Sequence, residues 1–250
     1  MIFYFNQKQF IDTSLALDIS MPLSANSDNP RAWYVDEPRM EPVRANGFIG
    51  SVLEGGAVNF RDIYFNPHGH GTHTESYGHI SEEFYPVSEA INEYFYGATL
   101  ISVEPRILPN GDRVVFADQL NSLVKGAFSD AIIIRTLPND SLKLTRNYSG
   151  TNPCYFDLEV VKVLNQMGVK HFLVDTPSVD REEDGGALVF HHAFWNYPNF
   201  VRKDRTITEL VFVSDEILDG QYILELQVAH FVNDAAPSRP LLYSINEKKD

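Results

Sequence analysis

Four histidines gather around one carboxylate between residues 68 and 79, and the fold must bring these side chains to one point if they act together. His68, His70, His73 and His79 are half of the eight histidines in the chain, and Glu75 lies among them. Imidazole and carboxylate together form the usual ligand set of Zn²⁺, Mn²⁺ and Fe²⁺. The segment therefore predicts the metal-binding core of an enzyme.

The spacing of these residues supports a shaped site. His73 and Glu75 are two residues apart, so an extended segment presents both side chains on the same face. Glu75 and His79 are four residues apart, which brings them together where the chain turns helical. The apolar stretch from Val58 to Phe65 predicts a strand that leads directly into the motif.

Two other interpretations of the histidine segment are a polar surface loop and a site for non-catalytic metal storage. Surface loops are usually built from Asn, Asp, Ser, Gly and Pro rather than from His. The glycines at positions 69, 71 and 78 allow backbone conformations that other residues resist, and they allow a ligand to approach closely. These features favour the catalytic interpretation.

Length and composition indicate one ordinary globular domain over residues 1–250. The chain has 44% hydrophobic and 22% charged residues, as soluble domains of this size do. Its formal net charge of −14 disfavours binding to nucleic acid and to anionic membranes, since both require basic patches. No apolar run approaches the ~20 residues that a membrane span needs. The sequence thus predicts a small-molecule substrate, with neither nucleic acid nor a membrane as partner.

The single cysteine and the first residues bear on location. Cys154 has no second cysteine to pair with, which fits a reducing cytosol, and a buried apolar role suits it better than that of a nucleophile. The start of the chain, Met1–Phe5, lacks a basic leader and a small-residue cleavage site, so it does not predict a signal peptide. We expect a cytoplasmic protein.

Strand-like and helical segments alternate along the chain and predict a mixed α/β fold. We expect strands over residues 99–103, 131–136, 171–175, 207–213, 221–231 and 241–245, helices over 117–128 and 156–167, and a surface loop over 26–42. The helix over 156–167 ends at Gly168 and joins two apolar strands, so this unit predicts a parallel βαβ crossover. Asp219-Gly220 predicts a turn between the strands on either side of it.

Later segments offer further ligands. Asp175 and Asp180 follow a predicted buried strand, although both are also common turn formers or helix caps. His191 and His192 are adjacent imidazoles among large apolar residues, and either could be a ligand. Glu209 lies in an apolar strand-like run, where a buried carboxylate needs a partner such as a metal.

With these residues in place, the chain resembles the cyclase family of metal-dependent hydrolases, which includes bacterial kynurenine formamidase and isatin hydrolase. The resemblance covers most of the chain, and its blocks occur in the family's order. They are residues 18–23, Gly71-Thr72-His73-Thr74-Glu75 with His79, residues 175–180, His191-His192-Ala193, residues 219–222 and residues 234–240. The resemblance implies the family's swivelling β/β/α fold and a homo-oligomer.

The resemblance also implies roles for individual residues. His73 corresponds to a metal-ligating histidine, and Glu75 takes the place of an aspartate that bridges two metals where two are bound. His79 corresponds to a histidine that acts as a proton shuttle. His191 and Glu209 correspond to a later histidine ligand and the glutamate ligand that follows it.

The chain departs from the family pattern at three places. The family's first histidine falls at Gly69, so His68 or His70 must substitute for it. Glutamate replaces aspartate at position 75, and the longer side chain moves the carboxylate by about an ångström or more. The interval from His191 to Glu209 is long, which implies an insertion around residues 197–204.

These observations predict a metal-dependent hydrolase that cleaves C–N bonds other than peptide bonds, in the manner of kynurenine formamidase. A cation, Zn²⁺ or Mn²⁺ with one or two per chain, would activate water, and His79 would carry the proton. Trp33 and Trp195 could form an apolar wall for a planar substrate, although core packing is their default role. The alternative is a metal-binding family member without hydrolase turnover. A structural or partner-binding acidic protein is a third interpretation.

Overall fold

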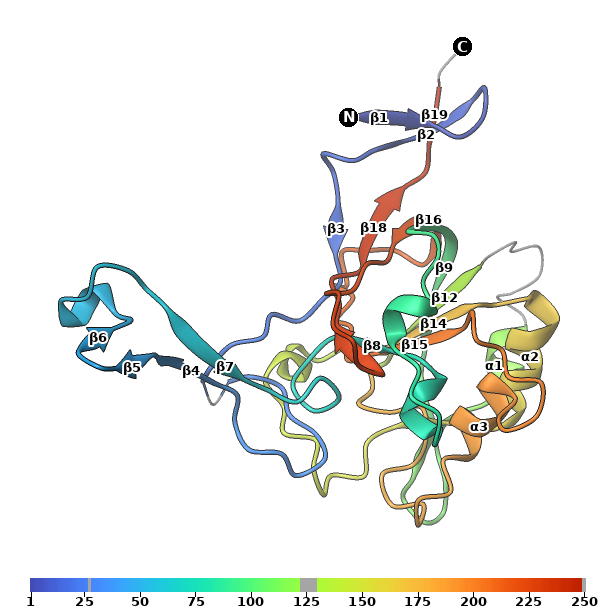
Figure 1. The fold of residues 1–250 in the computed structure, drawn as a ribbon. Coiled ribbons are helices and arrows are strands. Elements are labelled where there is room, and N and C mark those ends of the chain that lie inside the picture. Colours follow the sequence, from blue (N-terminus) through green and yellow to red (C-terminus); the bar gives the residue numbers. More distant parts are fainter. Residues whose placement is uncertain (27, 122–129, 249–250) are drawn as a thin grey trace.

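A computed structural model of the chain describes residues 1–26, 28–121 and 130–248. Within these residues, the central feature is a mixed sheet of nine strands in the order β17-β8-β15-β14-β12-β9-β16-β18-β3 (Figure 1). Its strands are β3 (Leu17–Asp18), β8 (His73–Glu75), β9 (Phe95–Val103), β12 (Ala131–Thr136), β14 (His171–Val174), β15 (Thr206–Glu209), β16 (Gly220–Glu225), β17 (Ala235–Pro237) and β18 (Leu241–Ser244). The predicted mixed α/β fold is confirmed.

The middle of the sheet is parallel because helical crossovers connect its strands. β9, β12, β14 and β15 are neighbours in parallel register, as predicted for β12 and β14. Every residue of β12 and β14 is buried, in keeping with their near-continuous apolar sequences. Ile132 and Ile134 pack on one face of the sheet and Ile133 packs on the other, so the sheet has a core on both sides.

Helix α2 (Glu159–Met167) forms the predicted crossover between β12 and β14. It buries Val160, Val161, Val163 and Leu164 against the sheet and ends at Gly168, whose φ of 74° favours glycine. The helix begins later than predicted, because Phe156 belongs to the short strand β13 (Tyr155–Phe156), which pairs with β11 (Arg113–Val115). Helix α1 (Ala117–Asn121) confirms the start of the other predicted helix, and residues 122–128 of that prediction lie outside the described residues.

The C-terminal strands are shorter than predicted, and the expected turn does not join neighbours. β15 stops at Glu209 because Leu210 has a φ of 54°, which leaves extended geometry, and β16 stops at Glu225. β15 and β16 are separated in the sheet by β14, β12 and β9, so Asp219-Gly220 does not close a hairpin between them. Pairing with distant strands, rather than local turn chemistry, places β16 between β9 and β18.

The strand that we expected to lead into the histidine motif is present, but it belongs to a projecting arm. Strand β7 (Arg61–Tyr64) pairs with β4 (Arg39–Pro42), and β5 (Arg44–Ala45) pairs with β6 (Phe48–Ile49). Residues 39–64, which we call the arm, extend away from the body (Figure 1). The expected strand over 58–65 is therefore not part of the central sheet, and β4 interrupts the expected loop over 26–42.

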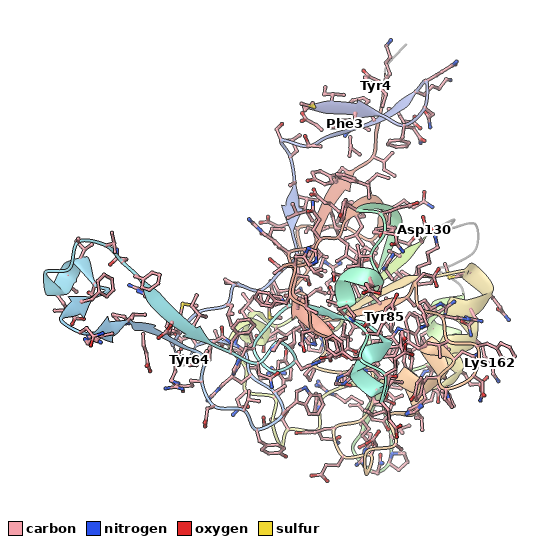
Figure 2. The ribbon with its side chains drawn as sticks, viewed as in Figure 1. Phe3, Tyr4, Tyr64, Tyr85, Asp130 and Lys162 are labelled. Atoms are coloured by element: carbon pink, nitrogen blue, oxygen red, sulfur yellow. The ribbon has the colours of Figure 1, made fainter. Side chains whose placement is uncertain are left out.

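A second small sheet lies at the chain ends. β1 (Ile2–Tyr4), β2 (Gln9–Asp12) and β19 (Asn246–Glu247) form it, and Figure 2 shows Phe3 and Tyr4 on its first strand. The remaining elements are β10 (Arg106–Ile107), helix α3 (Val189–Trp195) and the 3₁₀ turns η1 (Val52–Glu54), η2 (Tyr77–Ile80), η3 (Val87–Glu89) and η4 (Ser141–Leu144). Among the helices of the described residues, none is long and apolar enough to cross a membrane.

Histidine 171, at the start of β14, makes the fold sensitive to acid. Its Nδ1 lies 2.8 Å from Thr206 Oγ1 and its ring packs on Tyr96, and burial lowers its pKa to about 3. The unfolded chain binds a proton here below about pH 6.5, whereas the folded chain does not, so stability is lost as the pH falls through this window. As the pH is lowered, we expect the free energy of unfolding of the wild type to decrease more steeply than that of His171→Asn, by up to about 1.4 kcal/mol per pH unit. Denaturant titrations between pH 7 and pH 4 measure this difference, and equal slopes would contradict the assignment.

Candidate metal centre

Five segments of the chain converge at one end of the sheet. β8 carries His73 and Glu75, and the turn η2 that follows it carries His79. The loop before β8 supplies His68. Helix α3 supplies His191 and the last residue of β15 is Glu209, so these predicted residues come together in space although they are far apart in sequence.

Strand pairing explains why Glu209 reaches the motif. β8 and β15 are antiparallel neighbours, and His73 is the direct register partner of Glu209. Paired residues in adjacent strands project from the same face with Cβ atoms about 5 Å apart. His73 Nε2 accordingly lies 3.4 Å from Glu209 Oε2 and 3.9 Å from Glu75 Oε2.

Glu75 is the centre of the cluster. It is completely buried, its Oε1 lies 3.0 Å from His191 Nε2, and its Oε2 lies 3.0 Å from His68 Nδ1. The His68 contact lacks hydrogen-bond geometry, so among the described residues Glu75 Oε2 is a buried oxygen without a hydrogen bond. A buried carboxylate oxygen of this kind requires positive charge nearby.

His73 presents a second buried atom without a partner. Its Nδ1 lies 2.9 Å from the Gly71 carbonyl oxygen, which only accepts hydrogen bonds, so the ring proton belongs on Nδ1. In the neutral ring, Nε2 then turns a lone pair toward the oxygens of Glu209 and Glu75. No hydrogen bond within the described part of the chain reaches this nitrogen. A cation between a lone pair and two carboxylates would satisfy all three groups, so the residues fit a metal.

Two overlapping sets of side chains have the spacing of metal ligands. His73, Glu75 and Glu209 form a fully buried set, and His68, Glu75 and His79 form a second set nearer the surface. In each set the potential ligand atoms lie within 4.8 Å of one another. Glu75 belongs to both, which is the arrangement expected of a carboxylate that can serve two cations.

Asp180 fixes the orientation of His191. Its Oδ2 lies 2.6 Å from His191 Nδ1, while its two oxygens accept hydrogen bonds from the backbone N–H groups of Phe190 and His191 at the start of α3. The carboxylate therefore holds the helix terminus and the imidazole together, and it leaves Nε2 directed at Glu75. A carboxylate behind a ligating histidine is the usual support in metal sites.

We expect Asp180→Asn to lower the affinity for a divalent metal by about 10–100-fold. The amide can still accept a backbone hydrogen bond, but its NH₂ group cannot accept the proton of His191 Nδ1. Competition against a chromophoric chelator measures the affinity, and circular dichroism checks that α3 is retained. An unchanged affinity in the folded variant would show that Asp180 has only a structural role.

Asp234 is a member of the cluster that sequence reasoning missed as a site residue. Its Oδ2 lies 2.8 Å from His68 Nε2 and 3.5 Å from His79 Nδ1, and the two imidazole rings stack with centroids 4.2 Å apart. Asp234 comes immediately before β17, which pairs with β8. The signal available in the sequence was its position at the start of the 234–240 block, but nothing local ties that block to His68.

The carboxylates and the imidazoles of the cluster shift one another's pKa values. Burial opposes protonation of His68, but Asp234 and Glu75 outweigh it and raise the pKa of His68 to about 10. Burial likewise opposes protonation of His191, whereas Asp180 and Glu75 raise its pKa to about 10. Despite its burial, Glu75 has a pKa well below the ordinary value because of the surrounding histidines. The site thus concentrates negative charge that protons or a metal must neutralise.

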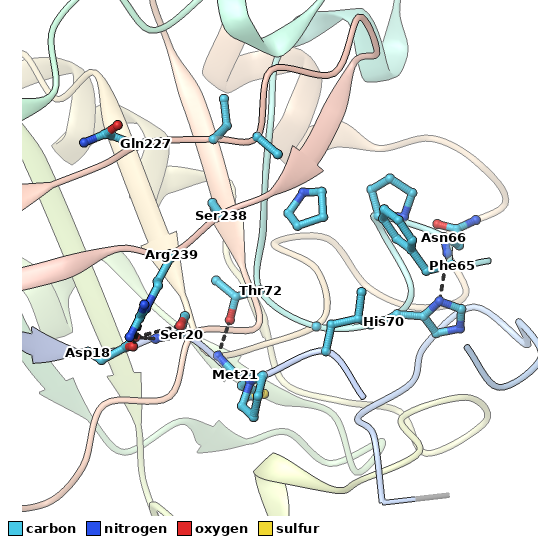
Figure 3. Close-up of a pocket in the computed structure, with 17 residues that line it drawn as sticks. Asp18, Ser20, Met21, Phe65, Asn66, His70, Thr72, Gln227, Ser238 and Arg239 are labelled. Carbon is cyan, nitrogen blue, oxygen red and sulfur yellow. Dashed lines mark hydrogen bonds and ion pairs between the residues drawn. The ribbon is translucent and has the colours of Figure 1, made fainter. Parts of the chain in front are cut away.

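The structure does not bring every candidate residue to the cluster. His70 accepts a hydrogen bond from the Asn66 backbone N–H at Nδ1 (Figure 3). Its Nε2 lies 2.6 Å from the Asp36 carbonyl oxygen, so both ring nitrogens contact backbone groups of the loop. Of these two histidines, His68 is therefore the one that lies in the cluster. His192 packs on Tyr197 outside the cluster, and Asp175 pairs with Lys143 at 2.7 Å.

A small cavity opens above the cluster. Its volume is about 240 Å³, and it is lined by Trp33, Asn66, His68, His79, Ser178, Arg181, Glu182, Asp184, Leu188, His191 and Glu209. Trp33 thus forms part of the wall, whereas Trp195 is buried in the core and donates a hydrogen bond to the Arg205 carbonyl oxygen. Cys154 is also buried, and burial raises the pKa of its thiol to about 12.

A comparison with models of protein families identifies the family to which the chain belongs. The Cyclase family model, described as "Putative cyclase", matches residues 17–181, which is more than half of the chain, so the chain belongs to this family. No curated protein matches it at a significant level.

Solved structures share the fold at low sequence identity. Isatin hydrolase A from Ralstonia solanacearum is 15% identical with a TM-score of 0.68, covering 93% of this chain and 92% of that one. An isatin hydrolase bound to the product analogue thioisatinate is 12% identical with a TM-score of 0.68, covering 92% of each chain. A protein named as a predicted metal-dependent hydrolase from Bacillus stearothermophilus is 15% identical with a TM-score of 0.61, covering 91% of this chain and 97% of that one. The fold of this chain is therefore that of the cyclase family.

Proposed function

We propose that this chain is a metal-dependent hydrolase that opens a small amide, lactam or ester, in the manner of an arylformamidase. The observation that carries the proposal is the buried contact of His73 Nε2 with the carboxylates of Glu209 and Glu75. Among the described residues, neither this nitrogen nor Glu75 Oε2 has a hydrogen-bond partner. His73, Glu75 and Glu209, with His191 beside them, would hold one divalent cation, and His68 would join Glu75 around a second where two are bound. The names of the structural neighbours, isatin hydrolase and metal-dependent hydrolase, support this class.

A cation held by these residues would supply the reactive nucleophile, because a divalent metal lowers the pKa of a bound water to about 7, and it would polarise the substrate carbonyl. The protein's part is to place the ligands, to hold their protonation states and to exclude bulk water. Glu75 and His73 are completely buried, which strengthens every electrostatic interaction at the site.

His79 is the side chain that we assign to proton transfer. Its Nδ1 lies 3.5 Å from Asp234 Oδ2, and its side chain is 29% exposed where it lines the cavity, so it can contact a substrate. It accepts a proton from water as the new C–O bond forms at the carbonyl carbon, and Asp234 stabilises the imidazolium. It returns the proton to the leaving nitrogen or oxygen as that bond breaks, so that water is added across the bond.

The cavity restricts the substrate to small molecules. Its volume of about 240 Å³ is below the range of about 300–1,000 Å³ that pockets for drug-sized ligands occupy. Trp33 and Leu188 provide apolar wall, while Asn66 and Ser178 provide polar groups that can orient a carbonyl. A compact amide or lactone with one flat apolar face suits these walls.

The proposal is tested by loading the protein with Zn²⁺ or Mn²⁺ and screening N-formyl amides, lactams and lactones. We expect metal-dependent hydrolysis of at least one compound class, abolished by a chelator and restored by the metal. Full metal occupancy without turnover on any class would overturn the hydrolase proposal and favour a metal-binding protein without catalysis.

A further inference from the structure

The loop over residues 181–188 forms one side of the cavity above the cluster. Asp180, directly before the loop, holds His191, and α3 begins directly after the loop. Four residues of the loop line the cavity, namely Arg181, Glu182, Asp184 and Leu188. The loop therefore faces any molecule that occupies the cavity beside the candidate metal centre.

Arg181 brings a permanent positive charge to this cavity. Among the described residues that line it, the other basic side chains are the histidines of the cluster. The side chain of Arg181 is 41% exposed, so a ligand can reach its guanidinium. A guanidinium offers five N–H donors in a planar fork, a geometry that matches the two oxygens of a carboxylate.

A buried carboxylate fixes the guanidinium of Arg181. Asp112 Oδ2 lies 3.1 Å from Arg181 Nε, and Asp112 is buried. The same carboxylate accepts hydrogen bonds from three further side chains, Asn110 at 2.9 Å, Asn152 at 2.8 Å and Tyr155 at 2.8 Å. These donors share the negative charge of the carboxylate, so Asp112 orients Arg181 without neutralising it completely.

The guanidinium keeps donors for a ligand. Arg181 Nη1 donates to the Glu183 carbonyl oxygen at 2.8 Å, and Nη2 donates to Asp112 Oδ1 at 3.4 Å. Each of these two nitrogens carries a second N–H, which no hydrogen bond within the described part of the chain engages. Paired N–H groups of this kind bind a carboxylate more strongly than they bind a neutral acceptor.

The acidic residues of the loop are engaged by backbone groups. Every oxygen of the two cavity-lining carboxylates accepts a backbone N–H, those of Glu182 from Gly150 and Asn152 and those of Asp184 from Gly186 and Leu188. These contacts hold the loop in place, and Arg181 is held with it. A donor that is already in position loses little conformational entropy when a ligand binds.

We propose that Arg181 selects substrates that carry a carboxylate at a distance from the bond that is cleaved. This inference rests on the proposed function, because it takes the same cavity as the substrate site. The scissile carbonyl lies at the cluster, and the free N–H groups of Arg181 bind the carboxylate on the loop side of the cavity. The substrate class is therefore an anionic amide, lactam or ester.

Formanilide and its ortho, meta and para ring-carboxylated isomers, assayed with the metal-loaded full chain, test the proposal. We expect the wild type to prefer one carboxylated isomer over formanilide. Arg181→Gln should raise KM for that isomer by about 10–100-fold, the range of a hydrogen bond to a charged group. Its kcat should stay within about threefold, because the contact is the same in the ground state and the transition state. Neither constant for formanilide should change by more than about threefold.

Arg106→Gln is the matched control. Arg106 pairs with Asp118, its side chain is 52% exposed, and it lies outside the set of residues that line the cavity. This variant should leave KM for every compound unchanged. Arg181→Lys keeps the charge but lacks the planar fork, so it should recover part of the loss. The metal content of each variant shows whether the cluster is intact.

Two results would overturn the role of Arg181 and leave the hydrolase proposal standing. One is a wild type that hydrolyses formanilide as well as every carboxylated isomer, and the other is an equal KM in wild type and Arg181→Gln. If none of the compounds is hydrolysed, the hydrolase proposal loses support, and isothermal titration calorimetry with the same isomers decides the role of Arg181. Binding that is at least about tenfold weaker in Arg181→Gln supports it, whereas equal or undetectable binding refutes it.

Discussion

Replacing Glu75 by Gln is expected to lower kcat/KM for the best hydrolysed substrate by at least about a thousandfold, which corresponds to about 4 kcal/mol of lost transition-state stabilisation. Glu75 belongs to both candidate ligand sets and contacts His191 and His68 from the middle of the cluster. An uncharged amide keeps the shape of the side chain but removes the charge on which both sets depend. Steady-state kinetics with the metal-loaded protein measure the loss.

Glu82→Gln is the matched control for this substitution. Glu82 lies a few residues further along the chain and is exposed, so the same chemical change there should leave kcat/KM within about twofold of the wild type. A Glu75→Gln variant that keeps more than a tenth of the wild-type kcat/KM would contradict the central role of this carboxylate.

Lys143→Met is expected to lower the free energy of unfolding by about 3–5 kcal/mol. Lys143 Nζ lies 2.7 Å from Asp175 Oδ2, and both side chains are buried at the end of β12 and β14. Burial raises the pKa of Asp175, and Lys143 is the principal group that opposes this shift. Removing the ammonium leaves a buried carboxylate whose remaining hydrogen-bond donor, among the residues that the structure describes, is Thr136.

The control for this prediction is a surface ion pair. Lys162 Nζ lies 2.6 Å from Glu159 Oε2, but both side chains are more than half exposed, so Lys162→Met should change stability by no more than about 0.5 kcal/mol. Adding Asp175→Asn to Lys143→Met should recover part of the loss, because a neutral amide needs no counter-ion. Denaturant unfolding measures all three variants, and equal effects of Lys143→Met and Lys162→Met would refute the argument.

Local sequence patterns sufficed to predict the parallel pair of β12 and β14. The strand at 131–136, the amphipathic helix ending at Gly168 and the strand from His171 are each recognisable alone, and their order implies a crossover. The spacing of His73 and Glu75 likewise predicts that both side chains share a face, because the two-residue period of a strand is local.

Features that depend on distant pairing could not be predicted in the same way. Asp234 reaches His68 only because β17 pairs with β8, and no local feature of either segment predicts this pairing. His68 and His70 are equivalent in spacing arguments, and only the contacts of His70 with backbone groups separate them. The strand β7 was expected, but nothing local in the sequence shows that it pairs with β4 outside the body.

The metal content of the purified chain tests the account most directly. Elemental analysis of wild type and His73→Ala, after incubation with Zn²⁺ or Mn²⁺ and removal of free metal, reports whether the imidazoles and carboxylates hold a cation together. We predict at least one metal per wild-type chain and less than a tenth of that amount in His73→Ala. Metal-free wild-type protein, or equal metal in the two proteins, would contradict the account.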